Sequence, residues 1–254
     1  MGKVFLSVII PCYDEMGNLQ KGVLDKVAHF LNKKKFSYEV IVVDDGSKDG
    51  SKQFIKNFVK EYPSFSLVDG NHYGKAGAVT KGILRAKGEY VLFTDMDQAT
   101  PIEEIDKLLP FFDQGYDVVI GSRGSTREGA PWTRAIMGTG MIFLRSAIVG
   151  LHGIKDTQCG FKMFRNEAAG KIFKAVDKLH GGFHEVGRSS VSAGFDVELL
   201  YIAQQVGYKI KEVPVKWLYV ETRRVNPIND SIQGLLELFK IKKNTISGKY
   251  SDLL

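Results

Sequence analysis

The sequence predicts an α/β protein with a mostly parallel sheet and helices on both of its faces. In the first half of the chain, short apolar runs rich in β-branched residues alternate with segments whose apolar residues recur at helical spacing. Such alternation is typical of parallel strands joined by right-handed helical crossovers. Four of the apolar runs are followed by polar turns. In a parallel sheet these turns share the edge at which open α/β sheets bind their ligands.

Five apolar runs of strand length lie in the first half of the chain. The predicted strands are Val4–Pro11, Tyr38–Val43, Phe65–Val68, Glu89–Thr94 and Asp117–Ile120. A turn at Cys12–Asn18 follows the first of them. The helices predicted between the strands are Leu19–Leu31, Asp49–Tyr62, Gly74–Ala86 and Pro101–Phe112. The first turn of a helix tolerates a proline such as Pro101 because the missing N–H group would have no partner there.

The second half of the chain is predicted to be more helical. Its predicted helices are Trp132–Leu151, Asn166–Leu179, Phe195–Val206 and Ile228–Lys243. The other segments are a polar turn at Asp156–Gly160 before Phe161–Phe164, a glycine- and serine-rich loop at His180–Gly194, and an extended strand at Lys209–Tyr219. No repeat or linker divides the chain. We therefore expect one domain over residues 1–225, with residues 226–254 as its helical C-terminal extension.

Composition and charge limit the functional classes. The chain is 44% hydrophobic and 25% charged, as in an ordinary folded protein, and its net charge of +6 suggests an anionic partner. We expect no nucleic acid, because the sequence has no helix-turn-helix, zinc-finger or aromatic RNA-binding signature. Cys12 and Cys159 lie far apart, which argues against a disulfide framework or a zinc site and fits a reducing compartment. No signal peptide or membrane-spanning run is evident, so a cytoplasmic protein is expected.

Membrane contact is an open alternative at two places. The long helix Trp132–Leu151 either lies in a membrane interface, with Arg134 and Arg145 at headgroup level, or belongs to the core. The basic tail of the chain either adds attraction to anionic lipid or is a solvated face. Its lysines are Lys240, Lys242, Lys243 and Lys249.

A pair of carboxylates, Asp95 and Asp97, follows the apolar run that ends at Phe93. Two hard oxygen ligands at the end of a strand suit Mg²⁺ or Mn²⁺, which commonly bridges protein carboxylates to substrate phosphates. The alternative is an aspartate-rich turn without a ligand. Three other turns that carry charged or polar side chains are expected at the same sheet edge, namely Tyr13–Glu15, Asp44–Ser47 and Ser122–Arg123. This convergence favours a site for a metal-bound diphosphate.

Four segments resemble, in the expected order, the family-2 inverting glycosyltransferases. They are Val8–Glu15 (VIIPCYDE), Val42–Ser51 (VVDDGSKDGS), Asn71–Ala78 (NHYGKAGA) and Asp95–Asp97 (DMD). Two further segments, Asp156–Lys162 (DTQCGFK) and Phe195–Tyr201 (FDVELLY), are similar to the polyprenyl-phosphate members of that family. They look most like the dolichyl-phosphate glucosyltransferase subgroup, and mannose synthases match less well. The resemblance covers nearly the whole chain.

The resemblance implies a GT-A fold, which is Rossmann-like, and a nucleotide-sugar donor with a UDP-sugar favoured. It predicts a metal-dependent, inverting transfer of a hexose, glucose from UDP-glucose, to dolichyl or another polyprenyl phosphate. The enzyme would be peripheral at a membrane surface, on the cytoplasmic face. The alternatives are transfer of mannose or N-acetylglucosamine to the same lipid, or transfer of a sugar to a saccharide hydroxyl.

The resemblance also assigns donor-site residues. The expected nucleotide-sugar contacts are Pro11, Tyr13, Glu15, Asp44, Asp45, Gly74, Lys75, Asp95 and Met96. In this assignment Tyr13 stacks on the base, Glu15 accepts from ribose hydroxyls and Asp44 accepts from a base N–H. Asp45 either contacts the donor or braces its loop. Lys75 either supplies charge to the donor or is an exposed lysine at the start of a helix.

Asp97 is the expected direct ligand of Mg²⁺ or Mn²⁺, with Asp95 as the second metal-site residue, facing the donor sugar or ribose. Mannose synthases usually carry a glutamine two residues after the second aspartate of this motif. Here that position is Ala99, with Gln98 one residue earlier, so the third protein ligand of that subgroup is not expected.

The expected catalytic residues are Asp97, Arg123 and Asp196. The planar fork of Arg123 suits the acceptor phosphate, and Arg223 and Arg224 either close over a phosphate group or form a solvated charge pair. A hydroxyl acceptor would need a general base, for which Asp196 is the candidate, although it can also be a scaffold or helix cap. A phosphomonoester, with its second pKa near ~6, is already largely ionised at neutral pH and needs no such base.

Overall fold

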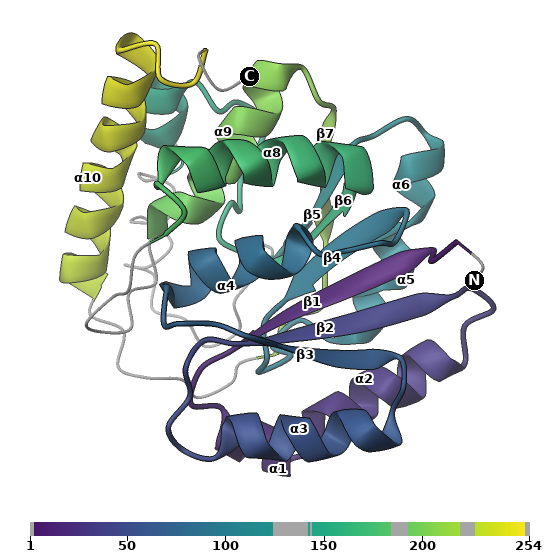
Figure 1. Ribbon diagram of the computed structural model, residues 1–254. Helices are drawn as coiled ribbons and strands as arrows, with labels where there is room; N and C mark the ends of the chain where they lie inside the picture. The colour runs from purple at the N-terminus through teal and green to yellow at the C-terminus, as the bar shows by residue number, and fades with distance from the viewer. Residues whose placement is uncertain (1–2, 124–141, 143, 184–192, 219–226, 252–254) are drawn as a thin grey trace.

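The computed structural model describes residues 3–123, 142, 144–183, 193–218 and 227–251. Within these residues a seven-stranded sheet runs through the molecule with helices on both faces (Figure 1). The strand order is β3-β2-β1-β4-β6-β5-β7. The strands are β1 (Leu6–Cys12), β2 (Tyr38–Asp44), β3 (Phe65–Asp69), β4 (Tyr90–Thr94), β5 (Val118–Ser122), β6 (Phe161–Arg165) and β7 (Ile210–Pro214). The predicted α/β class and mostly parallel sheet are confirmed.

One strand runs against the others. β1 pairs in parallel with β2 and β4, β2 with β3, and β5 with β7, whereas β6 is antiparallel to both β4 and β5. The register places Thr94, the last residue of β4, opposite Phe161, the first residue of β6. The turn that enters β6 therefore lies at the same sheet edge as the aspartates that follow β4.

Two predicted helices are each interrupted in the structure. The segment predicted as Leu19–Leu31 forms α1 (Met16–Gln20) and α2 (Val23–Asn32), because Gly22 between them has a left-handed φ of 71°. The segment predicted as Pro101–Phe112 forms the 3₁₀ turn η1 (Ile102–Glu104), α5 (Ile105–Leu108) and α6 (Pro110–Asp113). Pro110 explains the second break, since proline has no N–H group to continue the helical bonds.

The remaining helices follow the predictions closely. They are α3 (Ser51–Glu61), α4 (Gly74–Ile83), α8 (Asn166–Leu179), α9 (Ala193–Val206) and α10 (Pro227–Ile246). The observed strand β7 (Ile210–Pro214) is shorter than the predicted strand Lys209–Tyr219. Residues 144–149 are helical, but residues 132–141 and 143 of the predicted helix Trp132–Leu151 lie outside the described residues, as do residues 184–192 of the predicted loop.

The interpretation of Arg145 as a headgroup-level residue is wrong. Its side chain is buried and donates to Thr157 Oγ1 at 2.9 Å and to the carbonyl oxygen of Ile154. Arg145 thus binds the turn that leads to β6 instead of reaching a membrane surface. No helix in the described part of the chain is long and apolar enough to cross a membrane.

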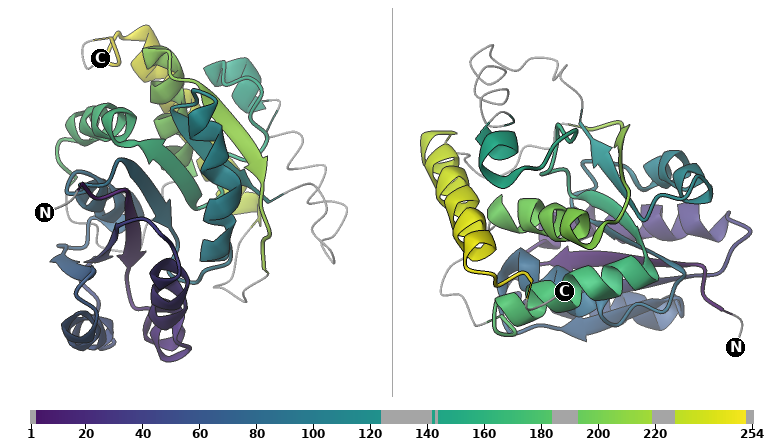
Figure 2. Two further views of the ribbon diagram at one scale, coloured as in Figure 1. Left: turned by 90° about the vertical axis from the view of Figure 1, so that its right-hand side faces the viewer. Right: turned by 90° about the horizontal axis from the view of Figure 1, so that it is seen from above.

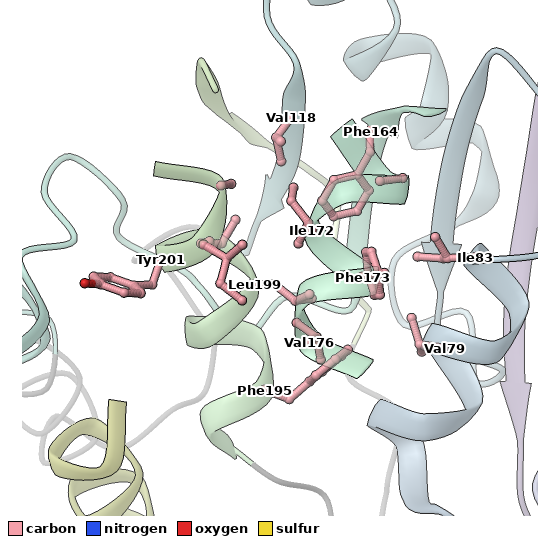
Figure 3. Close-up of a cluster of buried hydrophobic side chains, with 14 of the residues drawn as sticks. Val79, Ile83, Val118, Phe164, Ile172, Phe173, Val176, Phe195, Leu199 and Tyr201 are labelled. Atoms are coloured by element: carbon pink, nitrogen blue, oxygen red, sulfur yellow. The ribbon is translucent and has the colours of Figure 1, made fainter. Parts of the chain in front are cut away.

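The sheet separates two hydrophobic cores. Side chains alternate between the faces of a strand, so Val8 and Ile10 of β1 join one core while Ile9 joins the other. The Ile10 side is covered by α1, α2, α3, α5 and α6, and the Ile9 side by α4, α8, α9 and α10 (Figures 1 and 2). Figure 3 shows part of the Ile9-side core, where Phe173 of α8 lies among side chains of α4, β6 and α9.

Candidate active site

A pocket opens at the carboxyl edge of the sheet, where β4 and β5 end and β6 begins. Its walls are formed by Thr94, Asp95, Asp97, Ala99, Thr100, Arg123, Gln158, Gly160 and Trp217. Four separate segments of the chain supply these residues, and two negative side chains share the pocket with one positive side chain. The structure thus brings together three of the predicted site residues, namely Asp95, Asp97 and Arg123.

Asp95 is held between a lysine and a glycine. Its Oδ1 forms an ion pair of 2.5 Å with Nζ of Lys75, which comes from the first turn of α4. On another side it lies against Gly160, where an added Cβ would be 2.5 Å from Cγ and 2.8 Å from Oδ1 of Asp95. Gly160 directly precedes β6, so the antiparallel strand brings this glycine to the end of β4. Only a residue without a side chain leaves Asp95 in this position.

Lys75 carries its charge inside the site. Burial alone would lower the pKa of Lys75, but the carboxylates of Asp95, Asp196 and Asp97 raise it, so the ammonium group stays protonated. The alternative of an exposed lysine at a helix start is wrong, because the Lys75 side chain is only 22% exposed and is paired with Asp95.

Asp97 has a different environment from Asp95. Its Oδ1 accepts a hydrogen bond of 3.0 Å from the N–H of Ala99, and it forms no ion pair with any residue that the structure describes. Burial raises the pKa of Asp97, and the charge of Asp95 adds to that effect, against the opposing contributions of the Ala99 N–H and Lys75. A divalent cation would supply the counter-charge that Asp97 lacks among the described residues.

The turn from Asp97 to Thr100 explains why alanine can stand at position 99, where mannose synthases usually carry a glutamine. Gln98 has a left-handed φ of 49°, and its Nε2 donates to the carbonyl oxygen of Asp95 at 2.9 Å. The glutamine thus braces the turn, and Ala99 lines the pocket without a ligand atom in its side chain. The described residues contain no group of three or more His, Cys, Asp or Glu side chains that could hold a metal ion. Hard oxygens from two aspartates fit a Mg²⁺ or Mn²⁺ ion that takes its other ligands from a diphosphate and water.

Arg123 at the end of β5 is clamped by Asp156. Nε and Nη2 of Arg123 donate to the two carboxylate oxygens at 2.7 and 2.8 Å, and the Arg123 N–H donates at 3.0 Å. Burial alone would raise the pKa of Asp156, but the guanidinium holds it at about 2. In turn, Asp156 outweighs the effect of burial and raises the pKa of Arg123. A guanidinium has five N–H donors. The two that Asp156 takes leave others for a ligand in the pocket.

The turn that carries Asp156 is held in place by Glu212 of β7. Both oxygens of Glu212 in β7 accept backbone N–H groups of the turn, at 2.9 Å from Lys155 and 2.7 Å from Asp156. Arg145 binds the same turn through Thr157, as described above. A rigid turn fixes the plane of the Arg123 fork, which is what bidentate recognition of a phosphate requires.

Asp196, the candidate general base, lies in a buried ion pair. Its Oδ1 accepts a hydrogen bond from Nζ of Lys162, whose side chain is fully buried in β6. The same ammonium donates to the carbonyl oxygen of Cys159 at 2.7 Å and lies 5.1 Å from the centroid of the Phe93 ring. Asp196 does not line the pocket. This placement favours the scaffold interpretation of Asp196 over the general-base interpretation.

The donor-side residues form a second group, beside the pocket, at the ends of β1 and β2. Asp45 braces the loop before α4, as one interpretation predicted, because its two oxygens accept the N–H groups of Tyr73 and Gly74, each at 2.8 Å. Asp44 is fully buried, and its Oδ2 accepts from the N–H groups of Gly46 and Ser47 at 3.2 and 3.3 Å.

The other oxygen of Asp44 has an unused acceptor capacity. Asp44 Oδ1 is buried without a hydrogen-bond partner among the described residues. An unsatisfied buried acceptor costs free energy. A base N–H would satisfy this oxygen, although its burial means that a neighbouring group must move to admit the base.

Tyr13 stacks on a protein ring in this structure. Its ring centroid is 4.3 Å from that of His72, with 24° between the planes. Pro11 and Glu15 lie on either side of Tyr13 and are partly exposed, and Glu15 Oε2 accepts from Asn18 Nδ2 at 2.6 Å. Met96 is different, because its side chain is 2% exposed and belongs to the core on the Ile10 side of the sheet. The Met96 side chain is thus no part of the pocket, contrary to the prediction.

Some site residues fall outside the prediction or outside the described chain. Arg223 and Arg224 lie outside the described residues. Three residues that clamp, contact or line the site were not among the predicted site residues, namely Asp156, Gly160 and Trp217. Asp156 and Gly160 belong to the segment DTQCGFK, and its similarity to polyprenyl-phosphate glycosyltransferases could have indicated that they are site residues. No local pattern marked Trp217.

Comparison with known proteins decides the family. Residues 7–173 match the sequence pattern described as Glycosyl transferase family 2. The chain belongs to this family. It is therefore a glycosyltransferase, and the pocket at the end of β4 lies within the matched region except for Trp217.

Relatives within glycosyltransferase family 2 match nearly the whole chain. Dolichyl-phosphate beta-glucosyltransferase of Dictyostelium discoideum is 35% identical over 263 residues, which cover 96% of this chain and 76% of the relative. The human protein of the same name is 33% identical over 264 residues, covering 96% of this chain and 77% of the relative. The resemblance to this subgroup that the motifs indicated is confirmed.

A solved structure confirms the GT-A-like fold. Glucosyl-3-phosphoglycerate synthase from Mycobacterium tuberculosis, in complex with Mn²⁺, UDP and glucosyl-3-phosphoglycerate, has a TM-score of 0.59. The identity is 16%, and the match covers 94% of this chain and 80% of that chain. At this identity the likeness concerns the fold alone.

Proposed function

We propose that the protein is a metal-dependent, inverting glycosyltransferase that moves glucose from UDP-glucose to dolichyl or another polyprenyl phosphate. The observation that carries the proposal is the pocket in which Asp95 and Asp97 share one cavity with Arg123. Such a cavity offers separate places for a metal-bound diphosphate and for an anionic acceptor. The choice of glucose and of a lipid phosphate follows the relatives named above, which are dolichyl-phosphate beta-glucosyltransferases.

Asp97 is the proposed direct ligand of Mg²⁺ or Mn²⁺, and Asp95 the second metal-site residue. When bound, the ion would offset the negative charge that develops on the nucleotide diphosphate as it leaves. Lys75 holds Asp95 in place by its 2.5 Å ion pair and adds a second positive charge near the diphosphate. The proposed neighbours of the nucleoside are Tyr13 and Asp44.

Arg123 is the proposed acceptor-phosphate residue. Asp156 fixes its guanidinium, and the N–H donors that have no partner among the described residues are available to phosphate oxygens. The acceptor phosphate carries most of its negative charge at neutral pH without help from a base. The nucleophilic oxygen can then attack the anomeric carbon in line with the departing diphosphate, which inverts the configuration. The burial of Asp196 against Lys162 agrees with a reaction that needs no strong base.

The C-terminal segment belongs to the same structural unit in this proposal. Leu238 and Ile241 of α10 are buried in the core on the Ile9 side of the sheet. The hydroxyl group of Tyr250 donates to Oε1 of Glu198 at 2.7 Å, and His180 Nε2 lies 2.6 Å from Glu198 Oε2. We therefore propose one domain over residues 1–225 with residues 226–254 as its extension. The enzyme is proposed to work as a peripheral protein on the cytoplasmic face of a membrane.

A transfer assay tests the proposal directly. Purified protein is incubated with UDP-glucose, UDP-N-acetylglucosamine or GDP-mannose, with polyprenyl phosphate and Mn²⁺, and the lipid product is measured. We expect glucose transfer, its loss in Asp97→Ala, and its retention in Asp113→Ala, which changes an exposed aspartate in α6. Transfer to a saccharide hydroxyl together with no transfer to lipid phosphate would contradict the proposal.

A further inference from the structure

Helix α10 exposes an unusual amount of apolar surface. The described residues include seven exposed large hydrophobic side chains, and four of them lie on α10. They are Ile232, Leu236, Phe239 and Ile246, which are 52, 56, 55 and 77% exposed. A soluble protein tolerates single exposed hydrophobic residues, but such a concentration on one helix marks an interaction surface.

The four side chains share one face of the helix. They are separated by four, three and seven residues, spacings that return to the same side of an α-helix. The opposite face is already used, because Leu238, Ile241 and Asn244 are buried on the side of α10 that packs against α9. Figure 1 shows α10 at the outside of the molecule, on the side away from α3. The outer apolar face therefore has no packing role within the described fold.

Positive charge surrounds this outer face. The exposed Lys240, Lys242 and Lys243 lie among or beside the apolar residues at the same helical spacing. Glu237, the only acidic side chain described on α10, lies against Gly194 at the start of α9 and forms an ion pair of 3.9 Å with Lys240. Lys242 and Lys243 form no ion pair with any described residue, so they carry most of the positive charge of this face. An apolar face of a helix bordered by lysines is the pattern of a helix that lies in the plane of an anionic membrane surface.

We propose that the outer face of α10, formed by Ile232, Leu236, Phe239 and Ile246 with Lys240, Lys242 and Lys243, docks the enzyme on an anionic lipid bilayer. The apolar side chains enter the boundary between headgroups and acyl chains, and the lysines bind lipid phosphates. A second copy of this chain fits the face less well, because a symmetric pairing would bring its lysines together. The inference extends the proposed function, which places the acceptor in a membrane, but its geometry does not depend on that function.

Two double variants separate the apolar and the charged contributions. Leu236→Asn/Phe239→Asn removes half of the apolar face, and Lys242→Gln/Lys243→Gln removes two charges. All four side chains are exposed, so neither variant disturbs the core. Binding is measured by co-sedimentation with vesicles of phosphatidylcholine alone and of phosphatidylcholine with phosphatidylserine, neither containing an acceptor.

The apolar variant should lower the partition coefficient on the phosphatidylserine vesicles at least about tenfold. The lysine variant should lower it about thirtyfold on these vesicles, since each lysine near an anionic surface contributes about fivefold, and leave binding to phosphatidylcholine nearly unchanged. Matched controls lie elsewhere on the surface. Leu84→Asn, at a side chain that is 39% exposed, and Lys56→Gln/Lys60→Gln on α3 should bind as the unchanged protein does.

Wild-type binding by both α10 variants would overturn the proposal. So would a dimer in analytical ultracentrifugation without lipid that Leu236→Asn/Phe239→Asn converts to a monomer, because the face would then be an interface between copies. A short-chain, water-soluble polyprenyl phosphate separates this inference from the proposed function. Both variants should glucosylate it at the rate of the unchanged protein. If no protein glucosylates any lipid phosphate, the proposed function fails, and vesicle binding still decides the role of α10.

Discussion

Replacing Gly160 with alanine should disable transfer without disturbing the fold, because Gly160 leaves the space in which the Asp95 carboxylate lies. The backbone at Gly160 has no positive φ, so alanine can adopt it without strain. The conflict is purely one of contact. The new Cβ would be 2.5 Å from Cγ of Asp95 and closer still to Oδ2.

The displacement can be worked out from these distances. Two non-bonded carbon atoms come no closer than about 3.5 Å in a favourable contact, so Cγ of Asp95 must move by about 1 Å. A misplacement of ~1 Å at a reacting centre costs about a hundredfold in rate. We therefore expect kcat/KM for transfer from UDP-glucose to polyprenyl phosphate to fall about a hundredfold, which is about 3 kcal/mol of transition-state stabilisation.

A second glycine serves as the matched control. Gly170 in α8 has nothing within 4 Å of an added Cβ. Gly170→Ala should keep full activity and gain about 0.5–1 kcal/mol of stability. Steady-state kinetics and thermal unfolding of both variants make the comparison. Should Gly160→Ala unfold at the same temperature as the unchanged protein and keep its activity within threefold, the position of Asp95 would not matter and the reasoning would be refuted.

Three further predictions concern charged groups of the site. Lys162→Met leaves the buried carboxylate of Asp196 unpaired, so the free energy of unfolding measured in urea should fall by about 3–5 kcal/mol. The double variant Lys162→Met/Asp196→Leu removes both charges and should recover most of this stability. An equal loss of stability in both variants would contradict a buried ion pair. Asp156, whose pKa is lowered from 3.8 to about 2, contributes about 2 kcal/mol that is complete above about pH 4 and lost as the pH falls toward 2. The stability difference between the unchanged protein and Asp156→Asn should therefore shrink by that amount between pH 5 and pH 2; a constant difference would argue against the Arg123 clamp. Lys75→Gln should raise the KM for UDP-glucose about tenfold with little change in thermal unfolding, since one positive charge near the diphosphate is lost, and an unchanged KM would place Lys75 outside donor binding.

The parts of the fold that depend on local patterns could be predicted from the sequence. β1, β2 and β4 are mostly apolar, as expected when both faces of a sheet are covered. Their alternation with helices indicated a parallel sheet. The failure at Gly22 has a simple cause. The apolar spacing continues across the glycine, so periodicity alone does not show that the chain turns there.

The antiparallel strand β6 is harder to predict for a physical reason. Its sequence, FKMFR, carries Lys162 in the middle, and a lysine usually indicates a solvated side of a strand. Here the side chain is fully buried because Asp196, from a helix more than thirty residues away, neutralises it. The same holds for the clamp of Arg123 by Asp156. Both pairs join distant segments, and a single sequence does not show which distant charges meet.

Some residues of the candidate site could be predicted from local sequence, whereas others depend on contacts between distant segments. Asp95 and Asp97 could be placed from the sequence because a strand leads directly into them. Met96 was misassigned, since alternation along the chain turns its side chain into the core. Gly160 and Asp156 act through contacts that only the antiparallel path of β6 creates.

The proposed function is that glucose passes to a lipid phosphate with the help of a divalent ion held by Asp97. Its most direct test is to incubate the protein with UDP-glucose, polyprenyl phosphate and Mn²⁺ and to determine the anomeric configuration of the glycolipid by NMR. We expect a β-glucosyl phosphate lipid that forms with Mn²⁺, is absent in the presence of EDTA, and is absent with Asp97→Ala. An α-linked product, or a product that forms equally well in Asp97→Ala or in EDTA, would contradict it.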